Sequence, residues 1–140
     1  MELTLNYTFL EVDDHDAALA FYRDTLGLEV RQDVAMEGAR WLTVGPKDQP
    51  ELGIVLQSAG AGRSPDDAEA IRSLLAKGSL SGLVFQTDDV DGLFEKVAAS
   101  RAEVLQEPMD QPYGVRDCAF RDPAGNMVRF KSTTEELTET

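Results

Sequence analysis

The segment FLEVDDHD at residues 9–16 has a counterpart, VFQTDDVD, at residues 84–91. Each copy reads as an apolar strand, a pair of aspartates and the start of a helix, and the aspartate pairs lie 75 residues apart (88 − 13). A second match, GAR at residues 38–40 with GVR at residues 114–116, has an offset of 76 residues (114 − 38). A nearly constant offset over two matches indicates that the chain contains two copies of one structural unit.

Both copies predict the same order of elements, strand–helix–strand–strand–strand. In the first copy we expect strands near residues 5–12, 29–35, 39–44 and 52–57, and a helix from Asp13 or Asp14 that ends at Gly27. In the second copy we expect strands near residues 80–87, 103–107, 114–121 and 127–131, and a helix over residues 89–99. The fold class is therefore α+β, with two βαβββ modules that form a cleft between curved mixed sheets.

One domain accounts for residues 1–134, with module one at about 1–58, a linker with a helix at about 59–79 and module two at about 80–134. Residues 58–63 read as a flexible linker by composition. The helix that follows runs to Ala76, with Ser64 as its cap and Pro65 at its first position. Residues 135–140 read as a frayed tail.

Composition excludes several classes of partner. The chain has 140 residues and a formal net charge of −13, which repels nucleic acid and anionic membranes. Its one cysteine, Cys118, allows no intrachain disulfide, which fits a reducing compartment. No basic-then-apolar leader is visible, and no apolar run approaches the roughly 20 residues that cross a bilayer. We therefore expect a cytoplasmic protein.

Three runs carry a family resemblance. The run FYRDTLGL at residues 21–28 resembles the helix-to-strand signature of the vicinal oxygen chelate superfamily, which includes glyoxalase I, bleomycin-resistance proteins and extradiol dioxygenases. The run FRDPAGN at residues 120–126 resembles the last hairpin of that family, and LVFQTDDV at residues 83–90 is similar to its strand-and-acid stretch. The resemblance implies the fold and a homodimer. It does not imply one reaction, because the family includes isomerases, dioxygenases, thiol transferases and drug-binding proteins.

The resemblance also implies four places for metal ligands, on the first and last strands of each module. By motif matching they fall on Tyr7, Gly82, Arg129 and either Gly53 or Val55. Glycine has no side-chain ligand, a neutral tyrosine is a poor one, and arginine stays protonated and repels a cation. We therefore expect neither a metal nor another cofactor at these positions. A shifted metal site made of Glu11, Gln57 and Gln86 is left open.

Strand alternation predicts which side chains line the cleft. Leu42 and Val44 should face the helix of module one, which places Trp41 and Thr43 in the cleft. The candidates for ligand binding are Tyr7, Phe9, Trp41, Gln86, Tyr113 and Arg129. Such a lining suits a planar or partly apolar small molecule.

Structural alternatives accompany these assignments. Trp41 and Phe9 could form a second core, and Arg129 could pair with Asp117 or Glu11 as a buried structural ion pair. Cys118 and Phe120 should face the second helix, where the cysteine acts as a small hydrophobe. His15 is expected to be a solvent-exposed residue at a helix start. Arg40 and Arg116, which are repeat mates, should lie at a strand edge.

Two classes of function follow. The first is a metal-free protein that binds a small organic molecule in an aromatic cleft, for sequestration or resistance. The alternative is a metal-independent or shifted-metal enzyme, such as a lyase, an isomerase or a dioxygenase-like protein, that acts on a small oxygenated substrate. In the enzyme, Glu11 or Asp117 would be the general base and Arg129 would hold an anionic group. The aromatic residues without ligands favour the binding protein.

Overall fold

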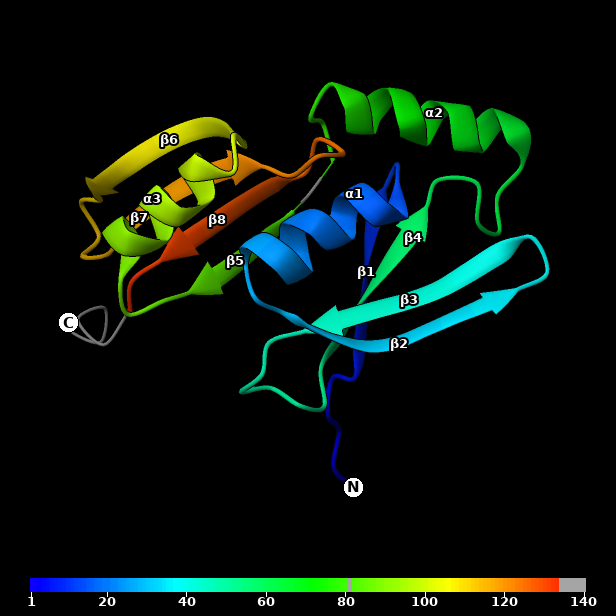
Figure 1. The fold of residues 1–140 in the computed structure, drawn as a ribbon, viewed down its shortest axis with the longest axis horizontal. Coiled ribbons are helices and arrows are strands. Elements are labelled where there is room, and N and C mark those ends of the chain that lie inside the picture. Colours follow the sequence, from blue (N-terminus) through cyan, green and yellow to red (C-terminus); the bar gives the residue numbers. More distant parts are fainter. Residues whose placement is uncertain (81, 134–140) are drawn as a thin grey trace.

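The computed structural model describes residues 1–80 and 82–133 and contains two four-stranded sheets (Figure 1). The first module comprises β1 (Tyr7–Val12), α1 (His15–Leu19), η1 (Ala20–Thr25), β2 (Glu29–Met36), β3 (Ala39–Gly45) and β4 (Gly53–Ser58). The helix α2 (Pro65–Ala76) links it to β5 (Leu83–Gln86), α3 (Val90–Ala99), β6 (Glu103–Asp110), β7 (Arg116–Arg121) and β8 (Met127–Lys131). The predicted α+β fold with two βαβββ modules is confirmed.

The two sheets have the same topology. Their strand orders are β1-β4-β3-β2 and β5-β8-β7-β6. In each sheet the first strand of the module pairs in parallel with the fourth, and the other pairings are antiparallel. The repeat that is visible in the sequence is therefore a repeat of hydrogen-bonding pattern as well as of element order.

Side-chain caps start the helices where the sequence predicts them. The Asp14 carboxylate accepts hydrogen bonds from the backbone N–H groups of Asp16 and Ala17. Its counterpart Asp89 accepts one from Gly92, and Ser64 accepts one from Asp67 at the start of α2. Each cap satisfies N–H groups that have no partner inside the first turn, which fixes the point at which strand gives way to helix.

The first helix is not a single α-helix, which corrects the prediction. After Leu19 it continues as the π-helix η1, in which the Leu26 N–H bonds to the Phe21 carbonyl at 3.0 Å. The wider turn accompanies the burial of two adjacent aromatic residues, since Phe21 and Tyr22 are 4% and 0% exposed and their ring centroids lie 4.9 Å apart. Helical spacing alone predicts only one buried face, so it does not reveal this widening.

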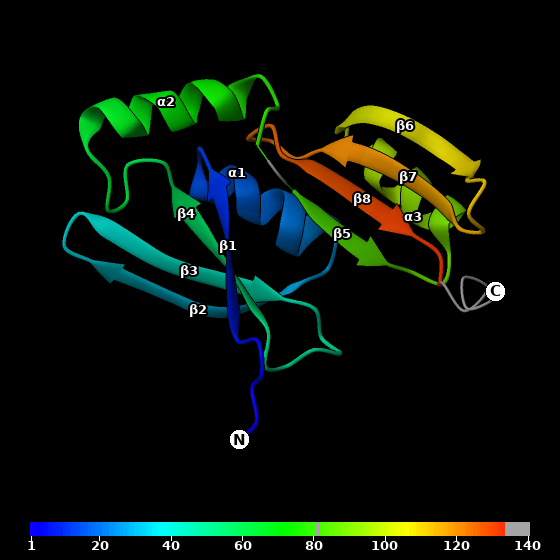
Figure 2. The same ribbon diagram turned by 180° about the vertical axis from the view of Figure 1, so that it is seen from behind.

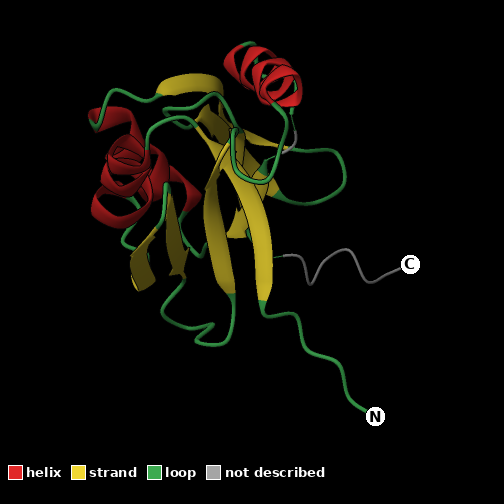
Figure 3. Ribbon diagram, turned by 90° about the vertical axis from the view of Figure 1, so that its right-hand side faces the viewer, coloured by secondary structure: helices red, strands yellow, loops and turns green. Residues whose placement is uncertain are grey.

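One hydrophobic core serves both modules. Figure 3 shows α1 and α3 on the same side of the strands, with α2 apart from them at the top. Leu42 and Val44 from β3, and Cys118 and Phe120 from β7, belong to this core, as strand alternation predicts. The opposite faces of the two sheets are therefore free of α1 and α3, and Figure 2 shows the strands in front of those helices.

Other boundaries also differ from the sequence prediction, and β5 covers Leu83–Gln86 instead of residues 80–87. Strand β6 extends to Asp110 instead of ending near residue 107, because Pro108 lies at a register shift between Gln106 and Met109, where a proline needs no ladder partner. The linker is held at both ends, since Ala59 is 4% exposed and the Arg63 guanidinium is hydrogen-bonded to Glu11. The tail predicted for residues 135–140 lies outside the described residues.

Among the described helices, none combines the length and the apolar character that crossing a bilayer requires.

The two helix ends give a matched prediction. Gly27 has a φ of 82° after the first helix, and its counterpart Arg101 has a φ of 70° after α3. A left-handed backbone is strained for arginine and not for glycine. We expect Arg101→Gly to stabilise the protein by about 0.5–1 kcal/mol and Gly27→Arg to destabilise it by at least as much. Urea unfolding of both variants checks this, and equal midpoints for the two would contradict it.

Candidate functional site

Three aromatic side chains gather on the uncovered face of the first sheet. The Trp41 ring packs edge-to-face against Tyr7, with centroids 5.7 Å apart, and against Phe9, at 6.5 Å. Tyr7 and Phe9 remain 45% and 55% exposed, so the cluster is half open to solvent and does not form a closed second core. The Trp41 Nε1–H donates to Gln32 Oε1 at 2.7 Å, which fixes the plane of the indole. We call Tyr7, Phe9 and Trp41 the aromatic face.

A buried hydroxyl lies on the same face of the sheet. Thr43 is two residues from Trp41 on β3 and is 0% exposed. Its Oγ1 is buried and has no hydrogen-bond partner among the residues that the structure describes. A buried polar atom without a partner is uncommon in folded proteins. The Thr43 hydroxyl, on the same face as the aromatic residues, therefore has a hydrogen-bonding capacity that no described residue takes up.

The second sheet presents a polar network instead of aromatic rings. Asp117 is 1% exposed and accepts hydrogen bonds from Gln106 Nε2 at 2.6 Å and Gln111 Nε2 at 2.9 Å. Arg129 NH1 lies 3.2 Å from the Asp117 carboxylate and donates to Gln106 Oε1 at 2.9 Å. Of the two partners foreseen for Arg129, the structure selects Asp117.

This network sets the charge state of Asp117. Burial by itself raises the pKa of Asp117, but the hydrogen bonds from Gln111 and Gln106 and the positive charge of Arg129 outweigh it and lower that pKa below its usual value. Asp117 is therefore a carboxylate held in place by three donor side chains. Such a group is a weak general base.

Glu11 is also engaged. Arg63 binds both of its carboxylate oxygens at 2.9 Å, and Gln57 Nε2 donates to Oε2 at 3.0 Å. Gln86, the third member of the shifted metal site, lies on the second sheet and contacts Lys131 of the neighbouring strand β8. Glu11 and Gln57 are therefore in contact, but Gln86 is not part of the group. Arg63 is already bound to the Glu11 carboxylate, which a metal ion would need as a ligand. Composition predicts a flexible linker around Arg63 and gives no signal for its pairing with Glu11.

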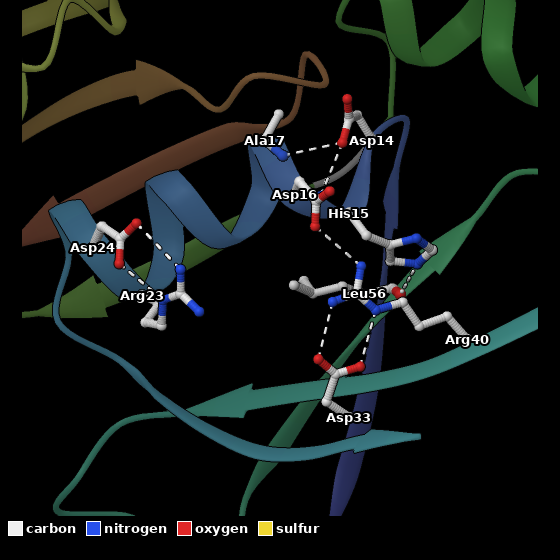
Figure 4. Close-up of polar contacts among 9 residues, drawn as sticks. All are labelled: Asp14, His15, Asp16, Ala17, Arg23, Asp24, Asp33, Arg40 and Leu56. Atoms are coloured by element: carbon white, nitrogen blue, oxygen red, sulfur yellow. Dashed lines mark hydrogen bonds and ion pairs between the residues drawn. The ribbon is translucent and has the colours of Figure 1, made fainter. Parts of the chain in front are cut away.

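The repeated arginines hold each module together at its edge. Arg40 binds Asp33 on β2 through two bonds of 2.9 Å and Asp16 on α1 at 3.2 Å (Figure 4). In the second module Arg116 makes the corresponding contacts with Asp91 on α3 and Asp110 on β6. Both arginines lie at the start of an inner strand, β3 or β7, and their partners Asp33 and Asp110 lie on the edge strands β2 and β6.

His15 corrects an expectation. It is half-buried, and its Nε2 lies 3.0 Å from the Leu56 carbonyl oxygen, so it connects the start of α1 to β4 (Figure 4). A histidine at a helix start is exposed only if no neighbouring strand offers a partner, and here β4 offers a carbonyl. Cys118 behaves as predicted, because it is 0% exposed and burial raises the pKa of its thiol to about 11, which makes it unreactive at neutral pH.

The predicted lining is divided between the two sheets. Tyr7, Phe9 and Trp41 meet on the first sheet, whereas Arg129 and Gln86 lie on the second. Tyr113 is 54% exposed in the loop that precedes β7. Within residues 1–80 and 82–133, neither a ring contact nor a hydrogen bond joins the two groups. The candidate residues on the two sheets therefore form two separate groups.

Comparison with known proteins gives a consistent answer. Residues 4–130 match the model of the Glyoxalase/Bleomycin resistance protein/Dioxygenase superfamily. The chain belongs to this superfamily. The crystal structure of UcmS2 is 34% identical in sequence, with a TM-score of 0.86 over 94% of this chain and 98% of that one. TnmS3, an antibiotic binding protein from Streptomyces sp. CB03234, is 28% identical, with a TM-score of 0.72 over 94% and 96% of the two chains.

A curated relative supports the same membership. The protein PA2024 of Pseudomonas aeruginosa is 30% identical over 136 residues, which covers 93% of this chain and 89% of the relative. For this superfamily member, the family settles the fold but does not assign an activity, because one fold carries many functions.

The positions that the family resemblance implies for metal ligands carry residues that do not fit a divalent ion. At Gly53 a Cβ atom would lie 3.1 Å from the Tyr7 ring, so that ring lies where a ligand side chain would begin. At Gly82 a Cβ atom would collide with the backbone carbonyl of Met127. Arg129 places a cation beside Asp117. In the described residues, no three His, Cys, Asp or Glu side chains come together as a possible metal site.

Proposed function

We propose that the protein binds a small planar aromatic compound against Tyr7, Phe9 and Trp41, without a metal, and that it serves sequestration or resistance. The observation that carries the proposal is the half-open aromatic face, whose two outer rings are 45% and 55% exposed. An exposed group of rings in edge-to-face contact offers flat surfaces on which another ring system can stack. The antibiotic binding named for TnmS3 supports the same class of function for this chain.

The alternative of an acid–base enzyme has less support. Both candidate bases are already engaged, since Glu11 binds Arg63 and Asp117 accepts from Gln106, Gln111 and Arg129. A general base needs a free lone pair within reach of the substrate proton and a pKa near the working pH. The lowered pKa of Asp117 moves it away from that range. Binding without reaction therefore accounts better for this arrangement.

Trp41 supplies the test, because it is the only tryptophan of the chain. In a thermal-shift screen of aromatic natural products, we expect one or more planar compounds to raise the Tm and to quench Trp41 fluorescence. Phe9→Ala should weaken the affinity for such a compound by about tenfold to a hundredfold, because it removes a stacking surface. Leu74→Ala on α2 is the control and should leave the affinity unchanged.

Two outcomes would contradict the proposal. The first is a screen in which no aromatic compound raises the Tm or quenches Trp41. The second is binding that disappears on dialysis against EDTA and returns with a divalent cation, which would make the site metal-dependent.

We further propose that the cleft is completed by a second copy of this chain. The uncovered face of the second sheet carries Val84 and Met109, which are 58% and 45% exposed, and that of the first carries the aromatic face. Both faces lie on the side away from α1 and α3. A twofold-related copy would lay the second sheet of one chain over the aromatic face of the other, which covers both sets of apolar side chains.

Sedimentation analysis checks the oligomeric state. We expect the wild-type chain to be a dimer at micromolar concentration and Val84→Asp to shift it towards the monomer, because the charge would be buried in the interface. Leu74→Asp, at a similarly apolar position on α2, should leave the dimer intact. A wild-type chain that is monomeric at 100-fold higher concentration would contradict the second-copy proposal without affecting the aromatic face.

A further inference from the structure

A cavity lies at the junction of the two modules. It has a volume of about 380 Å³ and is bounded by β1, by α2 and by the start of β5. In Figure 2, β1 and the start of β5 both lie below α2, and β5 slants away from β1. Its volume falls within the range of small-molecule sites in proteins, although it is at the lower end. The cavity can therefore hold part of a ligand.

The lining of this cavity has an apolar wall and a polar end. Phe9, Ile71 and Leu83 supply apolar surface from three different elements. Glu11 and Arg63 supply the polar end. Two hydrogen bonds of 2.9 Å join them, and their opposite charges neutralise each other. A cation or an anion would have to separate this pair, whereas a neutral group with a hydroxyl or ether oxygen would not. The lining thus suits an uncharged aliphatic chain.

Phe9 connects this cavity to the aromatic face. Its ring contacts Trp41 with centroids 6.5 Å apart, and Phe9 also lines the cavity. A ring system stacked beside Trp41 would therefore lie next to the cavity, with Phe9 between them and the cavity towards β5. Leu10 and Glu11 continue the lining along β1 from that point.

We infer that the cavity beneath α2 binds an uncharged aliphatic arm of the compound whose ring system lies on the aromatic face. This inference rests on the proposed function and narrows its ligand class to planar aromatic compounds that carry such an arm. Helix α2, which the sequence marks only as a linker, is then part of the binding site through Ile71.

Two probes separate the ring from the arm. The first is 2-naphthol, and the second is 6-(2-naphthyloxy)hexan-1-ol, which adds a hydroxyl-terminated chain. Quenching of Trp41 reports the ring for both probes. We expect the second probe to bind about tenfold to a hundredfold more tightly, because several methylene groups leave water.

The chain's two isoleucines locate the arm. Ile71 lines the cavity and Ile54 is 3% exposed in the core, so methyl-labelled isoleucine gives one reporting and one reference signal in an NMR spectrum. The longer probe should shift the Ile71 methyl signal and leave Ile54 in place. Ile71→Trp should fill the cavity and remove the gain in affinity, whereas Leu74→Trp on α2, outside the cavity lining, should retain it.

The outcomes distinguish the two proposals. Equal affinities for the two probes, an unmoved Ile71 signal, or a gain that survives in Ile71→Trp would overturn the cavity assignment. Quenching of Trp41 by 2-naphthol would then still support the aromatic face. Failure of both probes to affect Trp41 would reject the proposed function and the arm site with it.

Discussion

Replacing Asp122 with alanine should lower the free energy of unfolding by about 3–5 kcal/mol, because it removes a buried carboxylate that serves five donors. Asp122 is 5% exposed. Its Oδ1 accepts three backbone N–H groups of the hairpin between β7 and β8, those of Ala124, Gly125 and Asn126, each at 2.9 Å. Its Oδ2 accepts the Tyr22 hydroxyl at 2.6 Å and the Asn126 side-chain amide at 3.0 Å.

The same network joins the two modules. Tyr22 comes from the first module and Asp122 from the second, and Asn126 Nδ2 also donates to the Glu11 carbonyl at 2.7 Å. Loss of the carboxylate would leave several buried donors without partners at the seam between modules. Each such group costs about 1–3 kcal/mol, so the summed effect is large even after partial relaxation.

Urea unfolding at neutral pH measures the loss of stability in Asp122→Ala, and two further variants serve as comparisons. Tyr22→Phe removes one donor and should cost about 1–3 kcal/mol. Asp24→Ala removes an exposed carboxylate that pairs with its neighbour Arg23 on the surface, and it should leave the midpoint unchanged. An Asp122→Ala variant as stable as Asp24→Ala would show that the seam does not depend on this network.

Tyr22 adds a pH dependence. Burial, followed by the negative charge of Asp122, raises the pKa of Tyr22 well above its usual value. A group with a raised pKa keeps its stabilising effect below its unfolded pKa and loses it as the pH rises above that value. Stability should therefore fall above about pH 10 in the wild type and fall less in Tyr22→Phe.

Local signals were sufficient for the fold. The aspartates that cap α1 and α3, the glycine that ends the first helix and the alternation along β3 and β7 each act over a few residues, and each is confirmed. Tyr22 and Asp122 also lie in two of the three runs that carry the family resemblance. Their mutual hydrogen bond spans 100 residues, however, and no local pattern indicates it.

The site was only partly predictable for the same reason. Strand alternation places Tyr7, Phe9 and Trp41 on one face, because the side-chain period along a strand is fixed. It does not say that the aromatic residues and Arg129 lie on separate sheets, since that depends on how the modules pack. Arg63 illustrates a second limit, because a charged side chain in a glycine-rich linker can reach any nearby carboxylate, and the one that it binds is decided by tertiary structure.

Arg129 and Asp117 offer the second large effect. Arg129→Met should lower the free energy of unfolding by about 2–3 kcal/mol, because it leaves the Asp117 carboxylate buried without its cation. The side chain of Asp117 is 2% exposed and that of Arg129 is 30% exposed, so the loss should be smaller than for a fully buried pair. The double variant Asp117→Leu with Arg129→Met should be more stable than Arg129→Met alone, since no unpaired charge remains.

Acid pH provides an independent check on this pair. The pKa of Asp117 is lower in the folded chain than in the unfolded one, despite the opposing effect of burial, because of the Gln111 and Gln106 hydrogen bonds and the Arg129 charge. Its stabilising contribution is therefore complete above the unfolded pKa and is lost as the pH falls through the folded pKa. Stability curves measured from about pH 6 down to pH 2 should fall more steeply for the wild type than for the double variant. Parallel curves would mean that the partners of Asp117 do not stabilise its carboxylate, and that Arg129 is not held by a charge pair.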